Sequence, residues 1–256
     1  MFQHTDVWLN GIALSAVDPT ILVQSVQEGA PKIALSTGGP ARSDGLRLLY
    51  RSRQSLSVSV TFAFREHIDF TRRASAMDAV RSWFRDGQLM LWHRPEQILN
   101  VRAADFPELG NPRAWTRSMK MTFTAYEWPF FLDADETVRT LTGSSANGNI
   151  FLRGNGPAAR ASVSVTSESA VTSLTLTAGD TSISLADLNV TAGSEIKIGY
   201  DDQMIQYIKA GNVSILQKRT AASADDLLIP CGVSVPLAVS ANASVTAVFR
   251  ARGVWL

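Results

Sequence analysis

Alternation of apolar and polar side chains marks two long strands in the first half of the chain. In residues 56–65, Leu, Val or Phe at every second position alternates with Ser, Thr, Ala or Arg. Residues 119–125 alternate in the same way between Met, Phe or Ala and Lys or Thr. Because successive side chains of a strand point to opposite faces, each pattern predicts a strand with one buried and one wetter face. We expect these two strands to pair and to share a core face.

The segment between these strands, residues 69–87, has the pattern of a helix. Apolar side chains recur at helical spacing, Asp69 or Thr71 can cap the first turn, and Gly87 follows the last turn. A short strand follows at residues 88–94. The first half is therefore predicted to be α+β, with one helix covering one face of an antiparallel sheet.

The second half begins after a polar stretch, residues 133–146, which ends in small turn residues and is typical of a linker. It separates an N-terminal domain, residues 1–132, from a C-terminal domain, residues 147–256. In the C-terminal domain short segments rich in Val, Ile, Ser and Thr alternate with turns such as Gly179-Asp180. This pattern predicts an all-β sandwich. The whole chain is thus expected to be mainly β.

Composition and charge narrow the functional classes. Apolar residues make up 45% of the chain and charged residues 18%, which argues against disorder. The net charge is +1, with 15 Lys/Arg against 12 Asp/Glu in residues 1–132 and 9 against 11 in residues 133–256. Such a balance provides no whole-chain attraction to nucleic acid or to an anionic membrane. We expect no secretory signal at the start, and no apolar run approaches the roughly 20 residues of a spanning helix.

The side chains that carry chemistry form no catalytic or metal-binding pattern. Cys231 is the only cysteine, which excludes an intrachain disulfide, a thiolate zinc site and a CxxC pair. The three histidines lie in separate elements, and no GxSxG elbow is present. The acidic clusters at residues 133–136, 201–202 and 225–226 lie at predicted turns, where Asp stays hydrated. We therefore expect no enzyme activity, no cofactor and no metal.

Carbohydrate binding by a lectin-like, host-adhesion sandwich is an alternative function. Residues 140–256 contain no histidine and only five aromatic side chains, so the expected aromatic platform with Asn, Arg and His neighbours is absent. One of the five, Trp255, lies next to the last residue of the chain. It can insert into a neighbour or dock on its own domain, and we favour docking.

The chain resembles the distal tail protein family of long-tailed, siphovirus-like phages. In the first half the resemblance is carried by VWLNGIAL, by DPTILVQSVQEGAP, by the Gly-rich stretch that reaches RSDG, by SLSVSVTFAFRE and by DAVRSWFRDGQLML. The second half is similar to the galectin-like sandwich of that family, above all in SADDLLIPCGVSVPLAVSANASVTAVFRARGVWL. Cys231, at a turn where a polar residue is expected, is a small departure.

This resemblance implies a structural virion protein at the tail tip. The N-terminal domains would form a homohexameric ring around a channel through which DNA passes without specific binding. One face of the ring would meet the tail tube protein and the other the tail-tip hub protein, while the sandwiches would carry receptor-binding or baseplate proteins. Assembly would take place in the host cytoplasm, without a membrane.

The connection of residues 27–45 is too long and too apolar for a plain turn. It holds no base, nucleophile or metal ligand set, whereas its apolar residues would be poorly placed in water. It forms either a hairpin packed on its own domain or an arm that extends on an adjacent subunit by β-augmentation. The resemblance favours the arm, with Gly38, Gly39 and Pro40 in its bend and Asp44-Gly45 at the turn into the next strand. The expected interface residues are Lys32, Ile33, Ala34, Leu35, Ser36, Arg42, Arg47 and Arg51.

Overall fold

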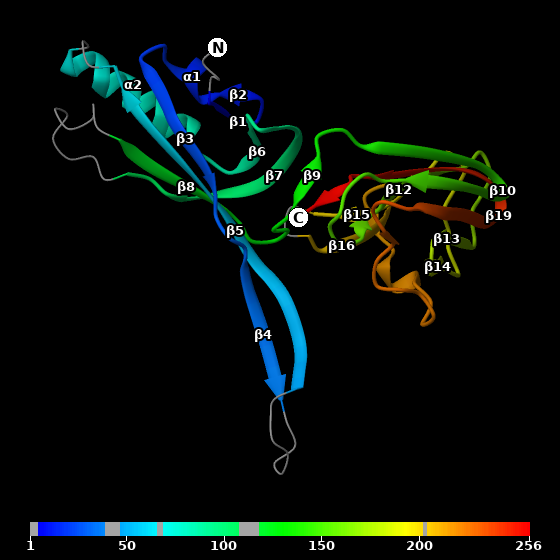
Figure 1. The fold of residues 1–256 in the computed structure, drawn as a ribbon. Coiled ribbons are helices and arrows are strands. Elements are labelled where there is room, and N and C mark those ends of the chain that lie inside the picture. The colour runs from blue at the N-terminus through cyan, green and yellow to red at the C-terminus, as the bar shows by residue number, and fades with distance from the viewer. Residues whose placement is uncertain (1–4, 39–46, 66–68, 108–117, 202–203) are drawn as a thin grey trace. The chain divides into compact units, whose positions relative to one another are not determined.

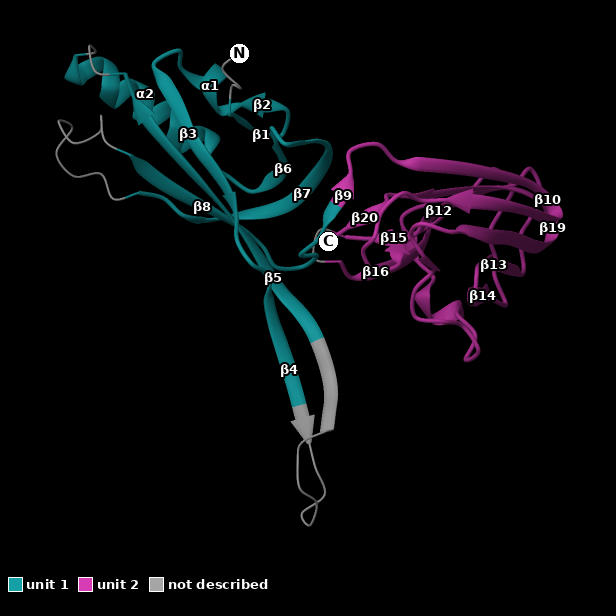
Figure 2. Ribbon diagram, in the orientation of Figure 1, with its two compact units in different colours: residues 1–131 teal, residues 132–256 magenta. Residues whose placement is uncertain are grey.

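The chain divides into two compact units, which are described separately. The computed structural model describes residues 5–38, 47–65, 69–107, 118–201 and 204–256, without the side chains of residues 37, 38 and 47–51. The units are Met1–Phe131 and Leu132–Leu256 (Figure 2). Antiparallel strands make up most of both, and the one long helix of the described residues belongs to the first unit (Figure 1). The mainly β fold class expected from the sequence is confirmed.

The first unit is built around one twisted sheet. Its strands, in spatial order, are β2 (Ile12–Ala13), β1 (Val7–Leu9), β6 (Gly87–Leu91), β7 (Arg94–Asp105), β8 (Met119–Ala125), β5 (Arg47–Phe64) and β3 (Ile21–Glu28). A further strand, β4 (Lys32–Gly38), pairs with β5 outside this order.

The two strands with alternating sequence lie side by side, as expected. The second half of β5 pairs with β8 in antiparallel register, so that Val60 lies opposite Met121. The side chains of Val58, Val60 and Phe62 are fully buried, as is Phe123 on β8. The alternating pattern therefore predicted correctly which face of β5 and β8 lies in the core.

The predicted helix is α2 (Phe70–Trp83), preceded by the four-residue α1 (Leu14–Val17). The carboxylate of Asp69 caps α2 by accepting a hydrogen bond from the Arg72 amide at 2.7 Å. The indole of Trp83 meets the Phe123 ring edge to face at a centroid distance of 5.9 Å, so the helix covers the buried face of the sheet. The helix ends before Gly87, which is the first residue of β6.

The second unit is a curled, all-β antiparallel sheet. In spatial order it contains β14 (Thr181–Leu185), β13 (Leu174–Ala178), β19 (Ser234–Ala251), β12 (Ser162–Thr166), β15 (Ile196–Tyr200), β16 (Gln206–Ala210) and β17 (Val213–Ser214), with β10 (Thr137–Phe151) paired to β19. The shorter elements are β11 (Ala159–Arg160), a 3₁₀ turn (Leu216–Lys218), β18 (Leu228–Ile229) and β20 (Val254–Trp255), while β9 (Phe131–Asp133) spans the division between the units. The galectin-like character of this unit remains a prediction.

A long two-stranded ribbon, β10 with β19, joins the two parts of this sheet. The first part of β19 pairs with β13 and its last part pairs with β12, while β10 runs along both parts. The register of β10 shifts between Gly143 and Ser145, and Gly143 has a φ of 143°, which favours glycine. Alternate side chains of β19, among them Leu237 and Phe249, are buried, so the ribbon presents one face to the core.

Residues 133–146, which the sequence predicts to be a linker, lie largely in strands. Asp133 belongs to β9 and is buried, and β10 begins at Thr137. The stretch is polar because most of its side chains face solvent, while hydrogen bonds to β19 hold its backbone. Its partner β19 is a single strand of 18 residues.

The C-terminal tryptophan docks on its own unit, as favoured from the sequence. The indole Nε1 of Trp255 donates a hydrogen bond of 2.8 Å to the buried carboxylate of Asp133. The Asp133 amide donates to the Gly253 carbonyl at 2.9 Å. The first and last strands of the unit are thereby fastened together.

Candidate subunit interface

The feature of the first unit that stands apart from its core is a two-stranded arm. Here β4 pairs in antiparallel register with the Arg47–Ser55 part of β5, with Ala34 opposite Ser52. Among the described residues β4 pairs with no other strand, and the other partners of β5 begin only at Leu56. Figure 1 shows β4 and the start of β5 leaving the sheet as a ribbon of two strands.

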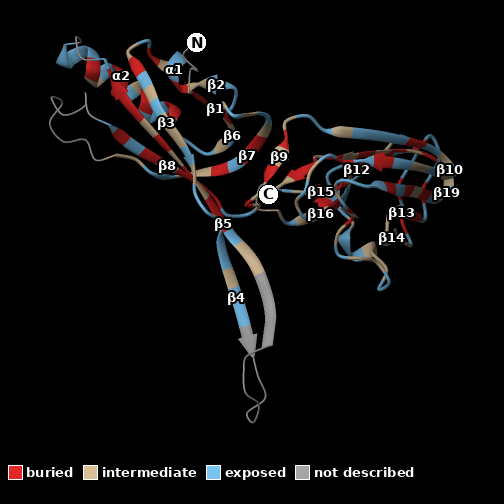
Figure 3. Cartoon of the chain, in the orientation of Figure 1, coloured by how far each residue is buried: buried red, intermediate tan, exposed pale blue. Residues whose placement is uncertain are grey.

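The arm carries apolar side chains that its own strands leave in water. Ile33 is 41% exposed and Leu35 is 62% exposed. Lys32 and Ser36 are also exposed, whereas Ala34 is half-buried, and Figure 3 shows no buried residue on the described part of β4. An isolated pair of strands is marginally stable in water, so this ribbon lacks the packing that usually holds one.

A cluster of charges holds the root of the arm on the β3 side. The carboxylate of Glu28, the last residue of β3, accepts hydrogen bonds from Arg94 Nε at 2.7 Å and Arg94 Nη2 at 3.1 Å. It also contacts His93 Nε2 at 2.6 Å. One residue further, the Gly29 amide donates to the Ser57 carbonyl at 2.7 Å. The chain therefore enters the arm from a fixed point.

The electrostatics of this cluster favour an ionised carboxylate. Partial burial raises the pKa of Glu28, but the hydrogen bonds from Arg94 and His93 outweigh that effect and bring it below the ordinary value. The Arg94 guanidinium also lies over the Phe131 ring at 4.4 Å from its centroid. Arg94 is thus fixed between a charge and an aromatic face.

On the β5 side, an aromatic contact holds the root. The guanidinium of Arg53 lies over the Phe130 ring at 5.1 Å from its centroid. Ser55, two residues closer to the sheet, is only 5% exposed. The arm is thus anchored where it joins the sheet, whereas Lys32, opposite Ser55 on β4, is already exposed.

The structure places the expected interface residues as follows. Lys32, Ile33, Ala34, Leu35 and Ser36 lie together on β4. The backbone of Arg47 lies opposite Gly38 and that of Arg51 opposite Leu35. Arg42, with the expected bend at Gly39 and Pro40 and the turn at Asp44-Gly45, lies outside the described residues. Sequence reasoning did not find the root cluster, since Glu28 and His93 are 65 residues apart.

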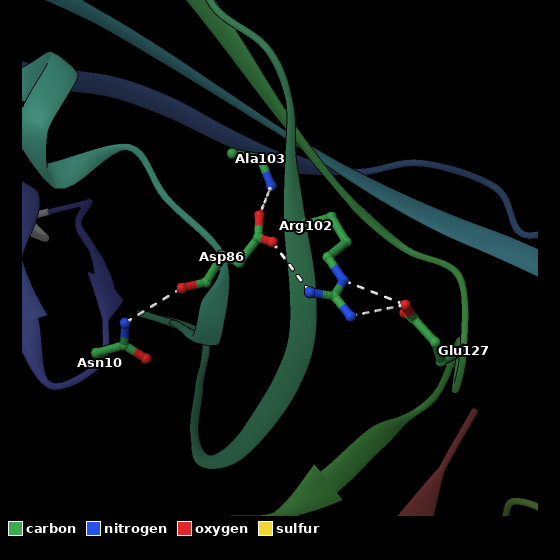
Figure 4. A network of polar contacts seen from close by, with 5 residues as sticks. All are labelled: Asn10, Asp86, Arg102, Ala103 and Glu127. Atoms are coloured by element: carbon green, nitrogen blue, oxygen red, sulfur yellow. Dashed lines mark hydrogen bonds and ion pairs between the residues drawn. The ribbon is translucent and has the colours of Figure 1, made fainter. Parts of the chain in front are cut away.

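A second polar network joins Asp86, which precedes the start of β6, to β7 (Figure 4). The carboxylate of Asp86 accepts hydrogen bonds from the Ala103 amide at 2.9 Å and from Arg102 Nη1 at 3.0 Å. Arg102 also donates to Glu127 through Nε and Nη2, at 3.1 and 3.0 Å. The Ala103 amide, with Arg102, lowers the pKa of Asp86. Each member has a partner, so we interpret this network as structural.

Among the described residues, no group of three or more His, Cys, Asp and Glu side chains could hold a metal ion. The acidic clusters noted in the sequence have structural partners: Asp133 binds Trp255, Asp225 binds Arg219, and Asp226 accepts from Tyr200. Across the same residues, no helix is long and apolar enough to cross a membrane.

The protein thus belongs to a class of mainly β proteins with two compact units, in which a pair of strands projects from the sheet of the first unit. No protein-family model matches the sequence, and no curated protein matches it either. Solved structures do show the same fold. The structure of the Dit protein of phage SPP1, titled a paradigm of the hub adsorption apparatus in phages that infect Gram-positive bacteria, has a TM-score of 0.69 and 14% identity. The alignment covers 97% of this chain and 98% of that one.

A second solved structure, the phage P2 baseplate in its activated conformation with calcium, has a TM-score of 0.52 and 10% identity. The alignment covers 97% of each chain. Identities this low show a shared fold, and they show it over almost the whole chain. The resemblance to distal tail proteins that the sequence carries is confirmed at this level.

Proposed function

We propose that the protein is a structural component of a phage tail tip, in which six copies form a closed ring. The fold of both units, matched along almost the full length of the SPP1 Dit protein, carries this proposal. The ring would join the tail tube protein to the tail-tip hub protein and leave a channel for DNA. The second unit would carry receptor-binding or baseplate proteins, and the assembled protein would reside in the virion.

The arm supplies a physical reason for assembly. Strands β4 and β5 pair with each other and leave their outer backbone edges without a strand partner among the described residues. A neighbouring copy can complete such an edge by strand addition and cover Ile33 and Leu35. Burying the exposed part of two such side chains contributes about 1–2 kcal/mol each.

The geometry of this contact favours a ring. In the proposed contact the arm of one copy docks on a different surface of the next copy, which makes the contact heterologous. Heterologous contacts that close produce rings, which agrees with the proposed channel. Six contacts, each of roughly 1,000 Å² or more, would make a stable assembly.

Deletion of Lys32–Ala41 tests the arm directly. We expect the wild-type protein to have six times its 27.8 kDa chain mass in mass photometry and the deletion variant to be a folded monomer. A milder variant, Ile33→Ser with Leu35→Ser, removes only the exposed apolar contacts and should shift the population toward monomers. Circular dichroism would establish that both variants fold.

The matched control is Val213→Ser, which removes a comparably exposed apolar residue, 68% exposed, on β17 of the second unit. It should leave the oligomer unchanged. A deletion variant that retains the hexamer mass would contradict the role of the arm. A wild-type protein that stays monomeric at high concentration would contradict the ring.

A further inference from the structure

The second unit has a shallow depression of about 400 Å³ on the outer face of its sheet, where β10, β19 and β13 run side by side. Asn147 and Asn149 line it from β10, Pro236 and Ala238 from β19, and Thr177 from β13. None of the residues that line it is charged. This volume lies at the lower end of the range for small-molecule sites and suits one or two sugar rings.

Strand register builds the depression. Ala238 lies between Asn147 on one neighbouring strand and Thr177 on the other, and Pro236 lies opposite Asn149. Since neighbouring strands are about 4.8 Å apart, Asn147 and Thr177 stand about 10 Å apart across the small Ala238 side chain. The result is a trough with a small floor and polar walls.

The polar walls are available to a ligand. The side chains of Asn147, Asn149 and Thr177 make no hydrogen bond to any described residue. Asn242 of the same unit shows the contrasting, structural use of an amide: it accepts from the Thr172 amide at 2.8 Å and donates to the Ala170 carbonyl at 3.2 Å. The amides of Asn147 and Asn149 therefore lie at the depression, whereas the Asn242 amide is hydrogen-bonded to the backbone of residues 170–172.

An apolar surface continues from the trough. Phe151 follows Asn149 by two residues on β10, so it lies on the same face, about 6.8 Å along the strand. Its side chain is 55% exposed, although it is large and aromatic. Pro236 is exposed as well. The sequence predicted no aromatic platform in this unit, but the strand register places the exposed ring of Phe151 beside these amides, where it can stack against the aliphatic face of a sugar.

We propose that this trough binds a neutral saccharide. Amide groups donate and accept at once, which suits neighbouring hydroxyls that do the same. The uncharged lining offers no partner for a phosphate, carboxylate or ammonium group. The saccharide would lie across Ala238, hydrogen-bonded by Asn147, Asn149 and Thr177, with Phe151 against one ring. This inference does not depend on ring formation.

The test applies the full-length protein to an array of neutral oligosaccharides beside sialylated and uronate-containing ones. Titration calorimetry with the strongest neutral oligosaccharide then measures affinity. We expect binding to neutral members. The variant Asn147→Ala with Asn149→Ala should lose about tenfold or more in affinity, since each hydrogen bond is worth about 1 kcal/mol. Phe151→Ala should weaken binding as well.

Asn212→Ala, which removes an exposed amide from the turn between β16 and β17, is the matched control and should bind as the wild type does. Equal melting temperatures of all variants would exclude unfolding as the cause. Absence of binding to every neutral saccharide, a preference for the charged ones, or full affinity in the double Asn variant would each overturn the proposal. So would capture of an extended peptide in place of any saccharide.

Discussion

At the scale of the residue, Glu28 shows how one ionised group fixes a long feature. Its carboxylate joins the last residue of β3 to Arg94 at the start of β7. Both side chains are mostly buried, so this contact is screened less than a surface ion pair. The arm begins four residues later, at Lys32. The contact between Glu28 and Arg94, which are 66 residues apart, therefore fixes the point from which the arm starts.

The same residue gives the first unit a pH dependence. Because the folded state lowers the pKa of Glu28 below its ordinary value of 4.5, the stabilisation is present above about pH 4.5 and lost as pH falls through the lower folded pKa. We expect Glu28→Gln to reduce the free energy of unfolding by about 1 kcal/mol at pH 7, and by much less near pH 3. Urea unfolding at the two pH values measures this.

The matched control is Glu168→Gln, which changes an exposed glutamate of the second unit and should have little effect at either pH. A Glu28→Gln variant whose loss of stability is as large at low pH as at pH 7 would show that the ion pair is not the cause.

At the scale of the element, β20 is held by a backbone contact that tolerates no side chain. Gly154 forms a parallel bridge with Val254 and has a φ of 121°. A Cβ added there would lie 2.2 Å from the Val254 carbonyl oxygen. Two residues later, the Gly156 amide donates to the same carbonyl at 2.8 Å. The last strand is thus pressed against the backbone of another segment.

Gly154→Ala should destabilise the second unit by about 3 kcal/mol or more, because backbone strain and a backbone clash act together. Gly193→Ala is the matched control: Gly193 has a φ of 78°, but nothing lies within 4 Å of its added Cβ. It should cost only about 1 kcal/mol. Chemical unfolding followed by circular dichroism compares the two variants, and equal losses would contradict the role of the close approach.

At the scale of the whole molecule, the proposed ring formation and the proposed saccharide binding belong to different units. The arm and its anchors belong to Met1–Phe131, and the saccharide trough belongs to Leu132–Leu256. Each unit has its own buried core. Assembly and ligand binding can therefore be separated by dividing the chain.

A fragment of residues 1–131 should form rings, and a fragment of residues 132–256 should be a folded monomer. Sedimentation velocity of the two fragments measures this, with the full chain as reference. Ring formation by the second fragment, or a monomeric first fragment that is folded, would place the assembly surface elsewhere.

The sequence predicted best the elements in which side chains alternate between the core and the solvent. The alternation in residues 56–65 and 119–125 predicted two paired strands, and Asp69, one of the two predicted caps, lies at the start of α2. Residues 32–36 form a strand paired with β5, which fits both the hairpin and the arm that the sequence left open. What they contact beyond β5 remains a prediction.

Other features had no local signal. The polar residues 133–146 have the composition of a linker, and only pairing with β19 makes residues 137–146 part of the strand β10. The Glu28 cluster and the trough beside Asn147 each join residues that are far apart in the chain.

The sequence by itself determined which segments are strands or helix wherever burial alternates along one element, because that periodicity is a local property of the backbone. It also determined the fold class, and its resemblance to phage distal tail proteins. Only the tertiary structure decided the partner of β10, the anchor of the arm and the trough on the second unit. These depend on strand register and on contacts across many residues, which no local pattern specifies.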